Sequence, residues 1–420
     1  MAAFNTFYLG ENISMEITKL DCGIRLVYDK CPHSKSVSVG VWIGSGTINE
    51  TEKFWGISHF IEHMLFKGTK SRTAKDIAVS MDKTGGQLNA FTAHDCTCVY
   101  SKTLAEDLDF ALELIADMLL NSKFDKKDIA TEKTIVEEEI DMYEDNPEEL
   151  AHDILAGICF EGHSLGWNIL GSHESVNSFD KKLIKEYMDL RYCADEIVIS
   201  VAGAFDETSI AEKCEKYFGG VRKEKSVNLV TATPEYKKGE IVRYKDIEQA
   251  HIAIGLPGLC YNDEKMYAHT LICNVLGGSM SSRLFQHIRE EKGMAYSVYS
   301  FPNVFKNGGY TSVYAGCSAE NIDAVSAMIE DELYNIHKNG ITVQEFEDMK
   351  QHLKAGIILA SESAGNKMST MGKQLILRNK IVTDDEVIKI VENLSMEDVE
   401  TCLYLFNPDK ISKVRLMPKQ

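Results

Sequence analysis

Two histidines and a glutamate lie close together in residues 56–66, which read GISHFIEHMLF. No proline and no internal glycine follows the first residue, so the segment is expected to be helical, with Ser58 able to cap its first turn. On a helix, His59 and His63 share one face and lie one turn apart, where two imidazoles can bind a single Zn2+. Glu62 is next to the second histidine and could accept a proton from water at that metal. The alternative is an amphipathic helix on which these side chains have no chemical role.

A third metal ligand is expected from residues 131–140, an acidic stretch with helical spacing. Glu132 and Glu139 are nearly two turns apart, so they project from the same face. One of these carboxylates would complete a set of two histidines and one glutamate with an open position, the arrangement of catalytic zinc. The other could accept the second ring N–H of a histidine ligand. A solvated acidic helix is the alternative, because four glutamates fall within eight residues.

The elements that must position these residues occur twice along the chain. In the first half, strand-like and helical segments follow one another at 36–43, 56–66, 74–83, 87–101, 105–120 and 126–143. In the second half the same order recurs at 250–256, 265–276, 282–291, 296–300 with 309–317, 322–339 and 343–360. Ala268, Leu271 and Ile272 replace the three residues of the metal motif there, so only the first half carries it. In the helix at 126–143, the residues expected to face inward are Ile135, Val136, Ile140 and Tyr143.

This repeat predicts an α+β fold of two homologous halves, each a mixed sheet with helices, that face each other as a clamshell. A chain of 420 residues is also too long for one ordinary core. Residues 1–225 would be the zinc-bearing catalytic domain and residues 226–240 a linker. Residues 241–420 would be the inactive homologous domain.

The charge and composition exclude several classes of protein. The chain has 45 Lys and Arg against 64 Asp and Glu, a formal charge of −19, which repels nucleic acid and attracts cationic peptides. No run of about 18 apolar residues predicts a membrane span. Residues 1–20 lack the apolar core of a signal peptide, and the eleven scattered cysteines are typical of reduced thiols. A cytoplasmic location is therefore expected.

Five motifs, in order along essentially the whole chain, resemble those of the pitrilysin family of zinc peptidases, the inverzincins with an H-x-x-E-H signature. They are residues 59–63, 88–92, 132 with 139–140, 249–251, and 277–285 continuing through 288–297. The chain is most similar to the mitochondrial processing peptidases and their bacterial homologues, and a bacterial homologue is favoured.

The resemblance implies a metalloendopeptidase with one Zn2+ per chain, bound by His59, His63 and Glu139. Glu139 is preferred over the neighbouring glutamates because the family ligand immediately precedes an apolar residue, which is Ile140 in this chain. Glu62 would be the general base, and Glu132 would support the ligands.

The resemblance also implies how a peptide is held. Asn89 and Ala90 belong to a motif similar to the family's edge strand, which pairs with the substrate backbone. Arg289 and Tyr296 match a pair that the inactive half contributes to position the substrate carbonyl and stabilise the oxyanion. Without the resemblance, these two residues would be taken for a surface cation and a strand aromatic.

Specificity is expected from Glu149 and Asp153, which lie at i and i+4 on the next helix. In the processing peptidases, acidic residues at these positions hold an arginine two residues before the cut, and Phe66 matches the residue that lines a pocket for a bulky apolar side chain after it. An ordinary solvated acidic face is the alternative. Two positions depart from the family pattern and leave substrate preference open. Ser279 stands in place of a third glycine, and His94 with the following aspartate replaces Arg-Glu.

The expected substrates are peptides or unfolded polypeptide segments that enter an enclosed chamber, and the chain is expected to act as a homodimer. A non-catalytic or partner-dependent subunit of a processing-peptidase-like heterodimer is the alternative, because such subunits share the fold. Those relatives usually lose part of the zinc signature, whereas all of it is present in this sequence.

Overall fold

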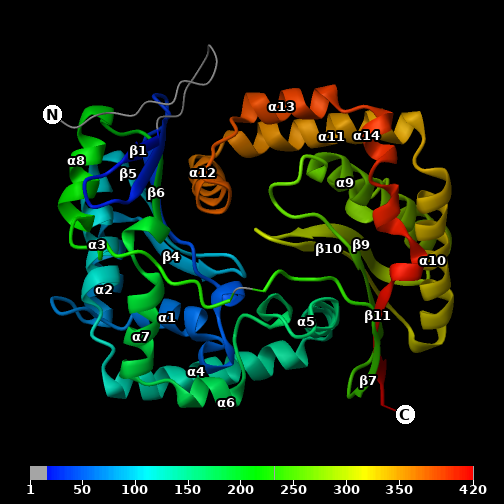
Figure 1. Ribbon diagram of the computed structural model, residues 1–420, viewed down its shortest axis with the longest axis horizontal. Helices are drawn as coiled ribbons and strands as arrows, with labels where there is room; N and C mark the ends of the chain where they lie inside the picture. The colour runs from blue at the N-terminus through cyan, green and yellow to red at the C-terminus, as the bar shows by residue number, and fades with distance from the viewer. Residues whose placement is uncertain (1–16, 231, 420) are drawn as a thin grey trace. The chain divides into compact units, whose positions relative to one another are not determined.

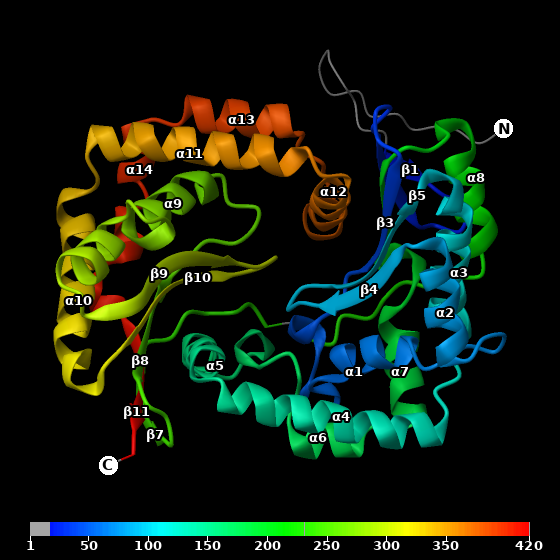
Figure 2. The same ribbon diagram turned by 180° about the vertical axis from the view of Figure 1, so that it is seen from behind.

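The computed structural model describes residues 17–230 and 232–419, which form two compact units (Figures 1 and 2). Among the described residues, the first unit holds 17–140, 169–230 and 358–383, and the second holds 141–168, 232–357 and 384–419. Two segments, 141–168 and 358–383, thus belong to the unit built mainly from the other half of the sequence. The predicted division into domains at residues 225 and 241 is based on homology along the chain and stays a prediction. The expected absence of a signal peptide also stays a prediction, because residues 1–16 lie outside the described part of the chain.

The first unit is built on a six-stranded sheet in the order β1-β2-β6-β3-β5-β4. Strands β2 and β6 are parallel, and all other neighbours are antiparallel. The strands are β1 (Ile17–Lys19), β2 (Arg25–Lys30), β3 (Ser36–Ile43), β4 (Gln87–Thr92), β5 (Thr97–Leu104) and β6 (Ile197–Gly203). Side chains of β3 alternate between faces, so Val37, Val39 and Val41 enter the hydrophobic core while Gly40 and Trp42 lie on the other face.

The second unit repeats this topology in the order β7-β11-β8-β10-β9. Here β7 and β11 are the parallel pair, and the remaining neighbours are antiparallel. The strands are β7 (Glu240–Lys245), β8 (Ala250–Pro257), β9 (Ala295–Val304), β10 (Gly309–Cys317) and β11 (Ser412–Pro418). Each of these strands has a counterpart in the first sheet at the same position and in the same direction. The predicted α+β class with two similar halves is therefore confirmed.

Helices accompany both sheets, and those that the sequence predicted occur in the predicted order among others that it did not predict. The first unit contains α1 (Ile57–Leu65), α2 (Ala74–Thr84), α3 (Leu108–Asn121), most of α4 (Lys126–Asp145), α6 (His173–Ser178), α7 (Lys181–Arg191), α8 (Glu207–Phe218) and α12 (Ala364–Arg378). The second contains α5 (Pro147–Cys159), α9 (Met266–Cys273), α10 (Ile322–Asn339), most of α11 (Val343–Ser361), α13 (Asp384–Asn393), α14 (Met396–Glu400) and two π-helical segments, Asn274–Gly278 and Phe285–Glu291. None of the helices in the described residues is long and apolar enough to cross a membrane.

One helix covers the second face of each sheet, and each of these helices comes from the other half of the sequence. Helix α12 packs on β2, β3 and β6 (Figure 1). Gly372 permits this contact, because a Cβ there would lie 2.0 Å from Nε1 of Trp42, whose indole N–H donates to Oγ of Ser200 at 2.8 Å. Helix α5 packs in the same way on β8, β10 and β11, where a Cβ on Gly255 would lie 2.8 Å from Sγ of Cys159.

Candidate metal centre

Helix α1 carries the two histidines, and a buried carboxylate holds its first turn. Gly56 precedes the helix with a φ of 86°, a left-handed conformation that favours glycine. The side chain of Glu50 accepts hydrogen bonds from the backbone N–H of Gly56 at 2.7 Å and of Ser58 at 2.9 Å. Ser58 lies inside the first turn, where its hydroxyl pairs with that of Tyr187 at 3.1 Å. The prediction that Ser58 caps the helix is therefore wrong.

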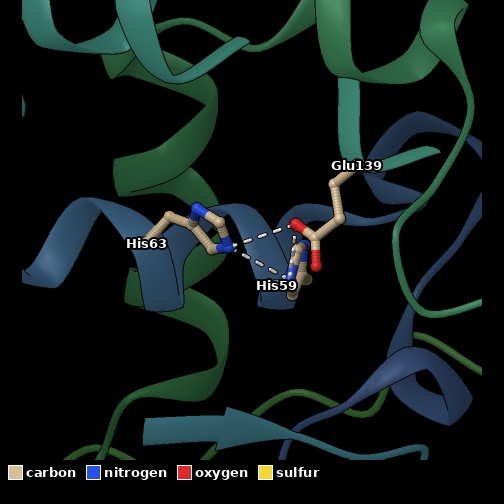
Figure 3. A group of neighbouring side chains, drawn as sticks. All are labelled: His59, His63 and Glu139. Carbon is tan, nitrogen blue, oxygen red and sulfur yellow. Dashed lines mark hydrogen bonds and ion pairs between the residues drawn. The ribbon is translucent and has the colours of Figure 1, made fainter. Parts of the chain in front are cut away.

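The side chains of His59, His63 and Glu139 converge on one point (Figure 3). The two Nε2 atoms are 3.2 Å apart, and Oε2 of Glu139 lies 3.7 Å from Nε2 of His59 and 3.5 Å from that of His63. Ligand atoms about 2.0–2.1 Å from a tetrahedral zinc ion would lie roughly 3.3 Å from one another. The triangle has nearly these dimensions, and two imidazoles with one carboxylate are ligands that suit zinc while leaving one position open.

Glu132 lies behind His63, on the same face of α4 as Glu139. Its Oε1 is 2.9 Å from Nδ1 of His63, and its Oε2 is 2.7 Å from Nζ of Lys67. A carboxylate at Nδ1 keeps the proton on that nitrogen and leaves Nε2 free to bind a metal. Burial alone would raise the pKa of Glu132, but hydrogen bonds from His63 and Lys67 outweigh it and lower that pKa, so Glu132 stays ionised.

His59 is held without such a partner. It is 7% exposed, and burial, with a smaller contribution from His63, lowers its pKa to about 3. The neutral ring is the form that binds metal. Its Nδ1 atom is buried and has no hydrogen-bond partner among the described residues. The orientation of this ring therefore depends on the backbone of α1 and on packing.

Glu62 lies one residue before the second histidine, and its Oε2 accepts a hydrogen bond from Oγ1 of Thr92, on β4, at 2.6 Å. Burial raises the pKa of Glu62, although the bond from Thr92 and the nearby His63 oppose that shift. The carboxyl group is thus poised to exchange a proton closer to neutral pH than an exposed glutamate would be. Neither Thr92 nor Lys67 was singled out as a site residue in the sequence.

Helix α4 presents a narrower buried stripe than predicted. Val136 and Ile140 are buried with Glu132 at a spacing of about one turn, as expected. Ile135 and Tyr143 are each 40% exposed, so the prediction that they face inward is wrong. Ile135 is one position, about 100° of rotation, away from the stripe. Tyr143 lies in the last turn, beyond the part of α4 that belongs to the first unit.

Comparison with known proteins places this site in a family. Residues 25–173 match the family described as insulinase (peptidase family M16), and residues 178–353 match the peptidase M16 inactive domain. The uncharacterized zinc protease YmxG of Bacillus subtilis is 42% identical over 378 residues, which are 90% of this chain and 92% of that protein. The chain belongs to peptidase family M16.

Further relatives of this M16 chain extend the match. The uncharacterized zinc protease Mb2805c of Mycobacterium bovis is 34% identical over 91% of the chain and 88% of that protein. Among solved structures, a protease from Helicobacter pylori has a TM-score of 0.89 at 22% identity, covering 96% of this chain and 99% of its own. A peptidase M16 inactive domain from Pseudomonas fluorescens has a TM-score of 0.91 at 19% identity, covering 97% of this chain and 98% of its own. These structural matches show the same fold.

The M16 chain has an open strand beside the metal centre. Strand β4 lies at the end of its sheet and pairs only with β5 among the described strands. Asn89 is exposed on it, whereas Ala90 is buried. Phe66 at the end of α1 lines a pocket of about 640 Å³ together with side chains of α2 and β4, Met81 and Leu88 among them. The predicted backbone-binding residues and the predicted apolar pocket therefore lie in the same unit as the metal ligands.

The other predicted site residues of this M16 chain belong to the second unit. The guanidinium of Arg289 stacks 4.7 Å from the ring centre of Phe285 and 5.2 Å from that of Tyr296, which is 74% exposed. Asp153 is partly buried, and its burial, together with the charge of Glu149, raises its pKa to about 6. Arg289 thus lies beside Tyr296, and Glu149 lies close enough to Asp153 to affect its pKa. The action of these two pairs at the metal centre stays a prediction.

Proposed function

We propose that this chain is a zinc-dependent endopeptidase that hydrolyses peptides or unfolded polypeptide segments. The observation that carries the proposal is the triangle of His59, His63 and Glu139, with Glu62 on the same helix. Its dimensions suit a tetrahedral zinc ion with one open position. Relatives named as zinc proteases support the same class of reaction.

In the proposed reaction, Glu62 takes a proton from the attacking water and later returns it to the leaving amine. Zinc, when bound, would polarise the scissile carbonyl and lower the pKa of water towards about 7. Thr92 holds one oxygen of Glu62 and leaves the other for water. Glu132 keeps the imidazole of His63 in the tautomer that binds metal. No covalent intermediate with the protein is required.

The substrate backbone would extend along the open edge of β4, where Asn89 and Ala90 lie, by the same hydrogen bonding that joins strands in a sheet. A large apolar side chain just after the cut would enter the pocket that Phe66 lines. Arg289 and Tyr296 would hold the substrate carbonyl and the oxyanion that develops from it. Their stacking supports this role, because each side chain restrains the other.

Arg289→Ala and Tyr296→Phe are each expected to lower kcat by on the order of 10²-fold, as does loss of an oxyanion donor, with zinc content unchanged. Steady-state kinetics on a defined peptide together with metal analysis would test this. Normal kinetics in both variants would show that the second half supplies no group to the reaction.

Specificity for a basic residue two positions before the cut would come from Glu149 and Asp153. The partial burial of Asp153 supports this proposal, because two carboxylates held together with restricted access to water gain most when a guanidinium lies between them. The predicted preference is for arginine at that position and for an aromatic or large aliphatic residue after the cut.

Digestion of a peptide library, with cleavage sites read by mass spectrometry, tests both the activity and this preference. The chain should be expressed alone and taken from its size-exclusion peak, which we propose is a homodimer. Cleavage should cease with a chelator and return with Zn2+. Arginine should be favoured about 10- to 100-fold over alanine two residues before the cut, and the preference should fall at high salt.

The double variant Glu149→Gln/Asp153→Asn is the matched control, because it keeps side-chain shape and removes both charges. Loss of the arginine preference with cleavage retained is expected. An arginine preference unchanged in this variant would rule the pair out. Absence of any cleavage by the isolated chain would favour the alternative of a non-catalytic or partner-dependent subunit. We further propose a cytoplasmic location, which the eleven free cysteines support.

A further inference from the structure

We propose that Glu50 is a positioning residue of the metal centre, which fixes the first turn of α1 and through it the ring of His59. The inference rests on the proposed zinc function. Nothing in the motif itself points to this residue, which precedes α1 in a loop that connects it to β3.

Glu50 holds the start of α1 through both of its carboxylate oxygens. The residue is 1% exposed, and both of its oxygens are used, one by the N–H of Gly56 and the other by the N–H of Ser58. Each of these amides lies at the start of a helix, where no backbone carbonyl is available to accept its hydrogen bond. A bidentate carboxylate fixes the position of both amides at once, which a serine or threonine cap could not do.

The loop that carries Glu50 is itself braced against the β4–β5 hairpin. The backbone N–H of Ile48 donates to the carbonyl of His94 at 3.0 Å, and Oγ1 of Thr97 donates to the carbonyl of Ser45 at 2.9 Å. Gly46 lies so close to the hairpin that a Cβ there would be 2.1 Å from the carbonyl oxygen of Ala93. Movement of Glu50 is therefore restricted by the sheet.

The position of His59 depends more on these contacts at the start of α1 than the position of His63 does. The ring of His63 is oriented by Glu132 through its Nδ1, whereas Nδ1 of His59 has no hydrogen-bond partner among the described residues. The direction in which His59 presents Nε2 therefore depends on the backbone of the first turn, next to Ser58, and on the packing of the buried ring. The same hairpin that braces Glu50 also carries Thr92, which holds Glu62. The β4–β5 hairpin thus helps to position both the metal ligand His59 and the proposed base Glu62.

Glu50→Gln tests this inference because the amide keeps the shape of the side chain but turns an NH2 group towards one of the two N–H donors. Zinc affinity, measured by competition with a chromogenic chelator on the purified full chain, is expected to weaken by about tenfold or more. Loss of a hydrogen-bond partner behind a metal ligand typically weakens metal affinity 10- to 100-fold, and tenfold is the lower end of that range. The value of kcat should fall while KM stays within about twofold.

Asp206→Asn is the matched control. Asp206 also accepts a backbone N–H at a helix start, that of Thr208 at 3.1 Å, but its helix α8 carries no proposed ligand. Glu50→Gln should lower the melting temperature of the metal-free protein more than Asp206→Asn does, because asparagine caps a helix about as well as aspartate. Only Glu50→Gln should weaken zinc binding. If Glu50→Gln does not fold, Glu50→Asp, whose shorter side chain cannot reach both amides, is expected to weaken zinc binding in the same way.

Wild-type zinc affinity in Glu50→Gln, or in Glu50→Asp if that variant is needed, would overturn the inference and leave the proposed function standing, since Glu50 would then serve stability alone. Failure of the wild-type chain to bind zinc would overturn the proposed function together with this inference. The zinc titration decides between these outcomes even if no peptide substrate is cleaved.

Discussion

Glu62→Gln is expected to retain zinc and to lose nearly all peptidase turnover. The amide has the same shape and can still accept the hydrogen bond of Thr92, but it cannot take a proton from water. General-base catalysis is typically worth 10²–10⁴-fold, so kcat should fall by at least about 10². Continuous assay of a fluorogenic peptide would give kcat, and elemental analysis of the same sample would give the zinc content.

Two outcomes would contradict this assignment. A variant that keeps more than roughly a tenth of wild-type turnover would show that another group takes the proton. A variant that loses zinc as well as turnover would show that Glu62 contributes to holding the metal, in which case the fall in activity would not identify it as the base.

Glu139→Gln is expected to lose both zinc and activity. The substitution replaces a charged ligand by a neutral amide in a set of only three, so zinc affinity should fall by more than the 10- to 100-fold that follows loss of a partner behind a ligand. Activity measured at a fixed low concentration of free zinc should fall by on the order of 10² or more. Excess zinc should restore part of it.

Glu138→Gln is the control for this prediction, because Glu138 is the adjacent residue of the same helix and is exposed. It removes the same charge without touching His59 or His63, and it should leave zinc affinity and kcat within about twofold of wild type. Equal losses in the two variants would show that the effect comes from the net charge of α4 and not from a bond to the metal.

The histidine pair, and the face that Glu132 and Glu139 share, could be predicted from the sequence because each geometry is local to one helix. Residues at i and i+4 of one helix meet whatever the rest of the fold does, and Glu132 and Glu139 share a face for the same reason. Which carboxylate binds metal and which supports His63 did not follow from spacing. That assignment needed the resemblance, and the contacts of Glu132 agree with it.

Two contacts that position the site could not be predicted, because they depend on how a loop and a strand fold back onto α1. Thr92 reaches Glu62 from β4, and Glu50 reaches the start of α1 from a loop. Ser58 was expected to cap the helix because serine is favoured at that position in general. Instead, the carboxylate of Glu50, which precedes the helix, accepts the backbone N–H groups at its start. Residue preferences at helix ends do not reveal such a contact.

The exchange of α5 and α12 has a consequence for the history of the gene. Two halves with matching strand order are the expected product of an internal duplication, and a duplication can in principle be undone by splitting the gene between its copies. Here neither copy would be complete. A product ending near residue 225 would lack α12 and leave Trp42 uncovered, while the remaining product would lack α5 and leave the face around Gly255 bare. Each copy thus depends on a helix from the other, so a split at that point would leave both products with an uncovered sheet face, although the repeat is still visible in the strands.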